Sequence, residues 1–171
     1  QTWTGPLAGD EGAPLSYLGV GSDPSPVDTV ALVYSWDWGD GSTDNGDFAS
    51  HAWVDQGSFS ASITVLDPQL GADVVPFTVV IANVAPTITS SPPLFTQEGA
   101  QYSYAPVATD PGVNDLQTWT LGVAPTGMTI ATPAAKAGVI LWPQLCTKST
   151  INSWPKNPSS TTINIDCERS F

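Results

Sequence analysis

Apolar and polar residues alternate along most of the chain, and a period of two residues is typical of a β-strand. In residues 58–65 the odd positions are apolar and the even positions carry hydroxyl groups. Apolar residues also occupy alternate positions in residues 75–81 and 32–38, including Trp36 and Trp38. The Asp40-Gly41 dipeptide that follows indicates a tight turn between two strands.

The second half of the chain repeats this pattern in shorter segments. We predict strands within residues 101–107, 116–121, 128–132 and 139–142. No segment has the 3.6-residue period of a helix, and 16 prolines and 15 glycines interrupt the strands throughout. This combination predicts an all-β chain built of immunoglobulin-like β-sandwiches.

One acidic pattern occurs twice and sets the size of the domains. Residues 11–24 align without gaps on residues 98–111, and eight of the fourteen positions are identical. A repeat at this separation predicts two sandwiches in tandem, over residues 1–85 and 86–143. Residues 144–171 are polar and atypical. They are either closing strands of the second sandwich or an extension that contacts a partner.

The charge balance changes the picture of possible partners. The chain carries 16 acidic residues against four Lys and Arg, a formal net charge of −12. Such a surface repels nucleic acids and anionic membranes and attracts divalent cations. No apolar run is long enough to be inserted across a membrane. The alternative explanation is that the acidity only keeps a secreted protein soluble.

The two cysteines, Cys146 and Cys167, both lie in the C-terminal segment. They form no CxxC motif or Cys/His cluster, so we expect a disulfide rather than a zinc site. Closing that loop would stabilise the fold by roughly 3 kcal/mol. A disulfide implies an oxidising, extracellular compartment. Gln1 is typical of an internal or processed start.

Residues 34–42 and 51–59 carry a more specific pattern. WDWGDGS occupies residues 36–42, and His51, Trp53 and Gly57 follow with the spacing His-x-aromatic-x-x-x-Gly. Val65-Leu66-Asp67 ends the next strand. With these motifs, residues 1–85 resemble a polycystic kidney disease (PKD) repeat. The resemblance implies a seven-stranded immunoglobulin-like sandwich, found in large surface proteins and as accessory domains of secreted bacterial enzymes.

Residues 86–143 resemble a bacterial cadherin-like or dystroglycan-type immunoglobulin-like domain. The matching segments are residues 86–88, 98–99, 102–104 and 108–111, together with PTGMTI at residues 125–130 and GVILWP at residues 138–143. Residues 145–171 depart from the family pattern at the closing edge of this domain.

Acidic residues in turn-like contexts recur in both copies of the repeat. Clustered carboxylates repel one another unless a cation joins them, and calcium takes about six to eight oxygen ligands. We therefore expect calcium to stiffen the chain, as the family resemblance also implies. The alternative is that these acids close turns and face water. The first site would consist of Glu11, Asp23, Asp28 and Asp67, and the second of Glu98, Asp110 and Asp115 with Asn83 as a further ligand.

The WDWGDGS segment contains acids of another kind. Asp37, Asp40, Asp44 and Asp47 do not match an EF-hand, so we expect Asp37 and Asp40 to accept hydrogen bonds from backbone amides of the hairpin. His51 is the only histidine, and no nucleophile motif accompanies it. The PKD resemblance implies that His51 is a structural hydrogen-bonding residue.

The chain has seven tryptophans, and they distinguish two functions. We predict a non-enzymatic structural or adhesive module of a secreted or cell-surface bacterial protein, with protein partners or self-assembly. The alternative is an accessory module of a secreted hydrolase that binds a polysaccharide or a protein. Exposed rings at Trp3, Trp53, Trp119 and Trp154 would favour stacking on polysaccharide, whereas buried rings would favour the structural role.

Overall fold

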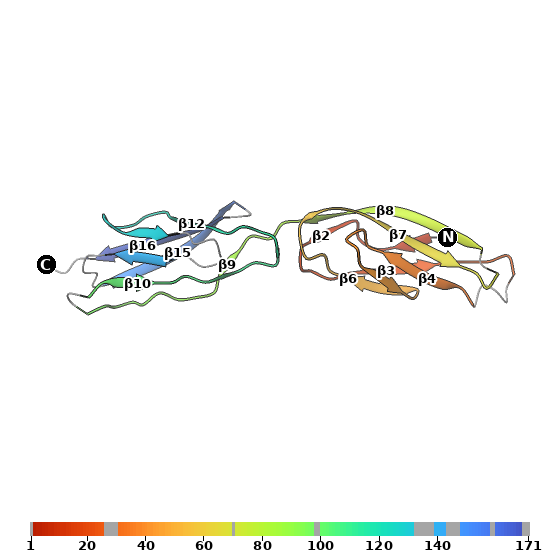
Figure 1. Cartoon of the computed structure of the whole chain (residues 1–171), viewed down its shortest axis with the longest axis horizontal. Helices are drawn as coiled ribbons and strands as arrows, with labels where there is room; N and C mark the ends of the chain where they lie inside the picture. Colours follow the sequence, from red (N-terminus) through yellow and green to blue (C-terminus); the bar gives the residue numbers. More distant parts are fainter. Residues whose placement is uncertain are drawn as a thin grey trace. The chain divides into compact units, whose positions relative to one another are not determined.

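The computed structural model describes residues 2–25, 31–69, 71–97, 100–131, 139–142, 148–157 and 160–168. These residues form strands, turns and loops and no helix, so the all-β prediction is confirmed. The chain divides into two compact units, Gln1–Asn83 and Val84–Phe171, each built from strands (Figure 1). No helix of the described residues is long and apolar enough to cross a bilayer.

The first unit contains two sheets. One is three-stranded in the order β1-β3-β6, and the other is five-stranded in the order β2-β8-β7-β4-β5. All pairs are antiparallel except β2 with β8. The strands are β1 Thr2–Thr4, β2 Ala8–Asp10, β3 Leu15–Val20, β4 Val33–Asp37, β5 Thr43–Asn45, β6 Phe48–His51, β7 Gly57–Leu66 and β8 Ala72–Ala82.

The first strand of this unit changes sheet. β1 pairs with β3, and after Gly5 and Pro6 the chain continues as β2, which pairs with β8. Pro6 has no amide hydrogen, so it suits a break between two hydrogen-bonded ladders. A side chain at Gly5 would overlap the ring of Tyr17. Because the first strand is divided between the two sheets, the described residues of this unit form eight strand segments, whereas the PKD resemblance implies seven strands.

The core of the first unit is rich in aromatic rings. The apolar face predicted for residues 58–65 points inward, and Ala61, Ile63 and Val65 on β7 are buried. Trp36 and Trp38 stack with their planes 7° apart and their centroids 5.3 Å apart. Large rings in such pairs stabilise a core by about 0.5–1.5 kcal/mol beyond the area that they bury.

The second unit contains three small sheets, in the orders β10-β14-β13, β11-β9 and β12-β16-β15. Its buried core includes Tyr102, Tyr104, Trp119 and Ile140. The strands are β9 Thr87–Ile88, β10 Tyr102–Tyr104, β11 Ala108–Thr109, β12 Thr118–Leu121, β13 Thr129–Ala131, β14 Val139–Trp142, β15 Lys148–Asn157 and β16 Ser160–Glu168.

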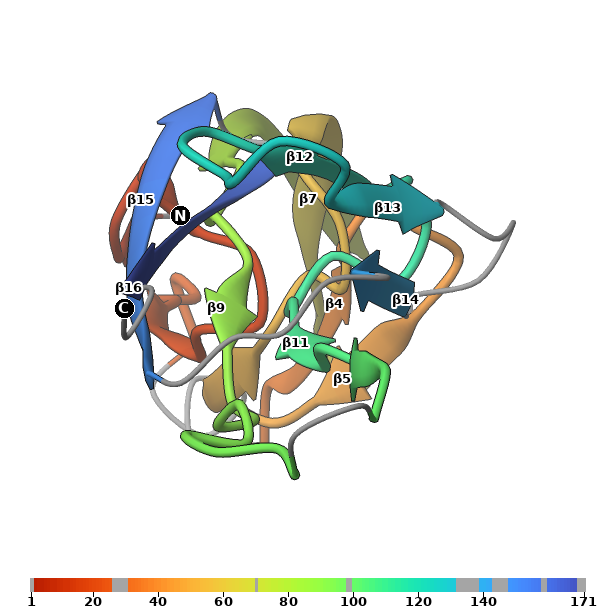
Figure 2. The ribbon, with the colours of Figure 1, turned by 90° about the vertical axis from the view of Figure 1, so that its left-hand side faces the viewer.

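The C-terminal segment contributes two strands to one sheet of the second unit. β15 and β16 form a long antiparallel hairpin, and β16 lies parallel to β12 (Figure 2). The described strands of this segment pair with each other and with β12, and the assignment of residues 144–171 to closing strands or to an extension stays a prediction.

The sequence repeat has a structural counterpart in two buried tyrosines. Tyr17 and Tyr104 occupy equivalent positions of the repeat. The hydroxyl of Tyr17 donates a hydrogen bond to the carbonyl of Pro6, and that of Tyr104 donates to the carbonyl of Ser90, both at 3.0 Å. Burial raises the pKa of Tyr17 to about 12, so this hydroxyl remains a donor. Each bond ties a core strand to the start of its own unit.

Candidate functional site

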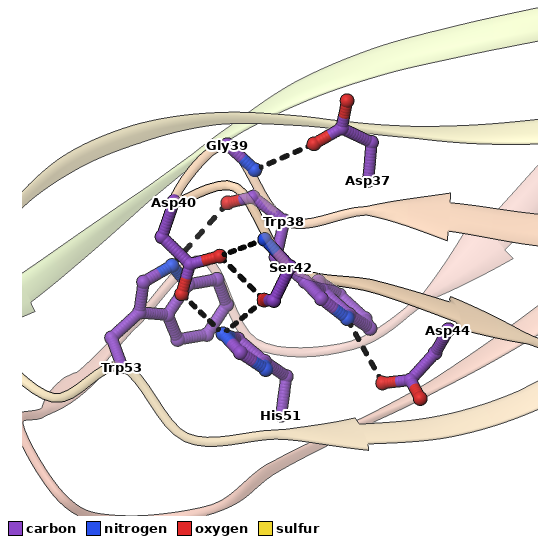
Figure 3. A network of polar contacts seen from close by, with 8 residues as sticks. All are labelled: Asp37, Trp38, Gly39, Asp40, Ser42, Asp44, His51 and Trp53. Carbon is purple, nitrogen blue, oxygen red and sulfur yellow. Dashed lines mark hydrogen bonds and ion pairs between the residues drawn. The ribbon is translucent and has the colours of Figure 1, made fainter.

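The densest polar network of the described residues surrounds His51, at the end of β6 (Figure 3). Nε2 of His51 lies 2.8 Å from Oδ2 of Asp40, which belongs to the turn between β4 and β5. The imidazole is parallel to the ring of Trp38, with 5.1 Å between centroids, and meets Trp53 edge-on at 4.6 Å. The PKD motif residues therefore converge in space as their spacing in sequence suggests.

The other oxygen of Asp40 closes the turn. Oδ1 accepts hydrogen bonds from the amide, at 2.9 Å, and the hydroxyl of Ser42. Burial by itself would raise the pKa of Asp40, but the hydrogen bonds from Ser42 and the contact with His51 outweigh it, so that the pKa is lowered. Asp40 thus stays charged and joins the turn to β6.

This arrangement differs from a Ser-His-Asp triad. In a triad the serine and the aspartate face different nitrogens of the imidazole, so that a proton can pass from the serine to the histidine. Here Oγ of Ser42, at 3.4 Å, and Oδ2 of Asp40 both approach Nε2 of His51. The hydroxyl of Ser42 is already bonded to Asp40. The geometry suits a structural clamp and not the activation of a nucleophile.

The neighbouring acids also accept hydrogen bonds within the hairpin. Oδ1 of Asp37 accepts the amide of Gly39, which confirms with Asp40 the roles predicted for these two residues. Asp44 accepts the indole N–H of Trp38 at 3.0 Å. Oδ1 of Asp47 accepts the amide of the next residue, Phe48, at 3.0 Å. Most of this acidic segment therefore stabilises its own turn.

The structure does not bring the residues of the first predicted calcium site together. The amide of Glu11 bonds to the carbonyl of Ala82, at the end of β8, whereas the amide of Asp67 bonds to the carbonyl of Gly71, just before β8 begins. Eleven residues at about 3.4 Å each separate the two ends of that strand. Grouping Glu11 with Asp67 in one site was therefore wrong.

Asp23 is also remote from Glu11. The two acids lie at opposite ends of β3, because Glu11 precedes this strand and Asp23 follows it. The amide of Gly21 bonds to the hydroxyl of Tyr34, whose strand partner is Val65, so Asp23 lies at the Asp67 end of the unit. Consecutive turns of a sandwich fall at opposite ends, and this alternation separates the predicted ligands.

The repeated aspartates close the same turn in both units. Oδ1 of Asp23 accepts the amide of Ser25 at 2.7 Å, and Oδ1 of Asp110 accepts the amide of Gly112 at 3.0 Å. In each copy the aspartate bonds the backbone two residues on, across the following proline. Asp23 and Asp110 therefore close turns through Oδ1, as one part of the alternative expected.

Two members of the second predicted site do converge. Carboxylate oxygens of Asp110 and Asp115 lie within 4.8 Å of each other. Two oxygens on one calcium ion, each at about 2.3–2.6 Å, are at most about 5 Å apart. Oδ2 of Asp110 is a buried atom with no hydrogen-bond partner in the described part of the chain. The donor set of this loop therefore fits a hard cation.

Asp28, Glu98 and Cys146 lie outside the described residues, so the disulfide of Cys146 with Cys167 stays a prediction. The side-chain amide nitrogen of Asn83 donates to the side chain of Gln56 at 3.1 Å, within the first unit.

Five tryptophan side chains are described, those of Trp142 and Trp154 not being among them, and the five lie in or against the cores. Trp36, Trp38, Trp53 and Trp119 are at most 3% exposed. Trp3 is half-buried and packs on Phe77, with 4.1 Å between ring centroids. Among the described side chains, no row of exposed tryptophans is present on either unit.

The sequence pattern missed one exposed surface. Leu18, Val20 and Phe48 occupy positions that alternation assigns to the solvent face, and all three are exposed. The register that places Leu18 opposite Phe48 cannot be read from either strand alone. The available signal was that Leu18 and Val20 are apolar and alternate with Tyr17 and Gly19.

Comparison with known proteins supports the assignment of the first unit. Residues 2–79 match the family model of the PKD domain. The cadherin-like resemblance of the second unit stays a prediction. A structure solved for the "Structural basis for the promiscuous specificity of the carbohydrate-binding modules from the beta-sandwich super family" is similar over 81% of this chain, with 12% identity and a TM-score of 0.42. The chain spans 50% of the length of that structure.

Proposed function

We propose that the chain is a structural or adhesive module of a secreted or cell-surface protein and that it acts through protein contacts. The match of residues 2–79 to the PKD domain supports a non-catalytic module, because PKD domains typically have no catalytic activity. It also supports a secreted or surface location, because PKD domains are typically extracellular. The geometry around His51 agrees with this role, since its polar groups are used to hold the turn.

The observation that carries the proposal is the burial of the tryptophans. A module that stacks on sugar rings must present flat aromatic faces to solvent. Trp53 and Trp119 were two of the four rings whose exposure distinguishes the functions, and both are buried. Trp3, a third, packs on Phe77. These rings support the structural role over polysaccharide binding.

Co-sedimentation of the full chain with insoluble cellulose and chitin tests this proposal. We expect the protein to stay in the supernatant at concentrations where a polysaccharide-binding module would be depleted. Saturable binding that is lost in Trp3→Ala or Trp154→Ala would favour the accessory-module alternative. An Asp73→Asn variant, altered at an exposed acid on β8, serves as the matched control.

We further propose that the loop from Asp110 to Asp115 holds calcium. The two carboxylates would be ligands, and the ion would neutralise their repulsion and stiffen the loop. The support is the convergence of their oxygens and the buried oxygen of Asp110 that lacks a described partner. When bound, the ion supplies rigidity and performs no chemistry in this account.

Melting curves in calcium and in chelator test the calcium proposal. A ligand that binds only the native state stabilises it, by about 2.7 kcal/mol at one hundred times its Kd. We expect calcium to raise the melting temperature of the wild type and of Asp73→Asn, and to raise that of Asp115→Asn much less. An equal rise in all three proteins, or no rise in any, would contradict the proposal.

A further inference from the structure

The chain contains one Asn-Gly pair, at the point where the first unit passes from one sheet to the other. Of the asparagines in the sequence, only Asn45 is followed by glycine. Asn45 is exposed and ends β5 at the edge of the five-stranded sheet, and β6 of the three-stranded sheet begins at Phe48. Asparagine is a chemically labile residue, and glycine has no side chain that would hinder attack by its own amide nitrogen. This pair is therefore the position at which spontaneous loss of a side-chain amide is most favoured.

Loss of the amide proceeds through a cyclic imide. The backbone nitrogen of Gly46 loses its proton and attacks Cγ of Asn45, so that a C–N bond forms between them. The bond from Cγ to the side-chain nitrogen breaks, and this nitrogen leaves as ammonia after taking up one proton. Water then adds to one of the imide carbonyls and opens the ring. The product is aspartate or isoaspartate, and nothing is oxidised or reduced.

Two hydrogen bonds hold Gly46 in the folded state. Its amide donates to the carbonyl of Tyr34 at 3.0 Å, so the proton that must be lost is engaged. Its carbonyl oxygen accepts the indole N–H of Trp36 at 2.9 Å. The side chain of Trp36 is buried and its ring stacks on that of Trp38, so the donor is fixed in the core. We call these two bonds the Gly46 latch.

The backbone of β5 also opposes ring closure. A residue in an antiparallel strand typically has ψ of about +135°. Asn45 pairs with Ser35 of β4, and the ring closes only after ψ of Asn45 turns away from the extended region. That turn would move the peptide between Asn45 and Gly46 away from both partners of the Gly46 latch. The reaction therefore requires the latch to break.

We propose that Asn45-Gly46 is a site of spontaneous deamidation that the Gly46 latch keeps unreactive in the folded protein. The inference goes beyond the proposed function and does not depend on it. The product would place a further carboxylate between Asp44 and Asp47, and like charges repel one another. Isoaspartate would also add a methylene group to the backbone beside the latch. A first unit that reacts while unfolded should therefore refold less completely than one that has not reacted.

Peptide mass spectrometry of the full chain after incubation at neutral pH tests the inference. The change from amide to acid at Asn45 is followed in buffer and in urea sufficient to unfold the protein. We expect conversion in urea to be at least about a hundredfold faster than in buffer, because the native state opens only rarely. Asn83 is the internal reference and should convert slowly in both conditions, since the β-branched side chain of Val84 hinders the same attack there.

Two variants distinguish the Gly46 latch from overall stability. Trp36→Phe removes the indole N–H that holds the carbonyl of Gly46. Val79→Ala removes buried volume on β8 and leaves the donors and acceptors of the latch unchanged. Mild urea brings the two proteins to the same free energy of unfolding, and there we expect Trp36→Phe to react several-fold faster. The amide of Gly46 should also exchange with deuterium oxide faster in Trp36→Phe than in Val79→Ala.

Three results would overturn the inference. Equal rates at Asn45 in buffer and in urea would show that the fold gives no protection, and an unreactive Asn45 in urea would show that the pair is not labile. Equal rates in Trp36→Phe and Val79→Ala at the same free energy of unfolding would show that protection comes from overall stability and not from the Gly46 latch. Any of these results would leave the polysaccharide test of the proposed function unaffected.

Discussion

Replacing His51 by alanine tests whether the polar network holds the first unit together. His51 makes one hydrogen bond to a charged group, at 2.8 Å from Asp40, and two aromatic contacts, with Trp38 and Trp53. A bond of this kind contributes about 1.5–3 kcal/mol, and each aromatic pair about 0.5–1.5 kcal/mol. Because such terms are not additive, we expect a loss of about 3–5 kcal/mol in His51→Ala.

A loss of that size is large for a unit of this length. Native domains are stable by roughly 0.05–0.15 kcal/mol per residue, or about 4–12 kcal/mol for the first unit. Urea unfolding followed by tryptophan fluorescence measures the change, since Trp38 and Trp53 contact His51 directly. A double-mutant cycle with Asp40→Asn should give a coupling free energy of about 1–3 kcal/mol.

Asp47→Asn is the matched control for the cycle. It removes the same charge from the same segment, but the side chain of Asp47 accepts a hydrogen bond from the amide of its own neighbour, Phe48. We expect a change below about 0.5 kcal/mol for this exposed residue. The structural assignment of the network would be refuted by two results together. They are a loss of unfolding free energy below about 1 kcal/mol in His51→Ala and a coupling free energy of zero with Asp40.

Three further predictions concern the same unit. Gly39→Ala should be several-fold more destabilising in chemical unfolding than Gly41→Ala. Both glycines have a positive φ, but only a side chain at Gly39 would overlap the backbone of Ser60. Equal losses of unfolding free energy in the two variants would contradict this. Tyr17→Phe should lower the free energy of unfolding by about 1 kcal/mol in urea, because it removes the hydrogen bond to the carbonyl of Pro6. An unchanged unfolding midpoint would contradict a stabilising role for this bond. Folding lowers the pKa of Asp40, so the stability that its carboxylate contributes is fully present above the ordinary pKa of 3.8 and is lost as the pH falls through the folded-state pKa. The difference in unfolding free energy between wild type and Asp40→Asn should therefore shrink below pH 3.8. A difference that stays constant with pH would argue against this role of Asp40.

Local patterns in the sequence were sufficient to predict three strands of the first unit, β4, β7 and β8. The alternation in residues 58–65 and 75–81 corresponds to β7 and β8, because a half-buried strand needs one apolar face. The turn roles of Asp37 and Asp40 also followed from short-range chemistry, since an aspartate bonds amides close to it in sequence.

Relations between distant segments could not be predicted in the same way. The sequence grouped Glu11 with Asp23 because they recur together, but the direction of β3 places them at opposite ends of the unit. The parallel pairing of β12 with β16 was equally inaccessible, since alternation within a strand does not specify its neighbour. The same repeat grouped Asp110 with Asp115, and these two do converge because both belong to one short loop.

Hydrogen exchange at the indole nitrogens tests the central claim that the tryptophans serve the fold. Nε1 of Trp36 donates to the carbonyl of Gly46 at 2.9 Å, that of Trp38 to Asp44, and that of Trp53 to the carbonyl of Trp38 at 3.3 Å. We expect these three indole protons, assigned by Trp→Phe variants in heteronuclear NMR spectra, to exchange with deuterium oxide as slowly as core amides. Complete exchange within the first spectrum would place these rings at an open surface and contradict the account.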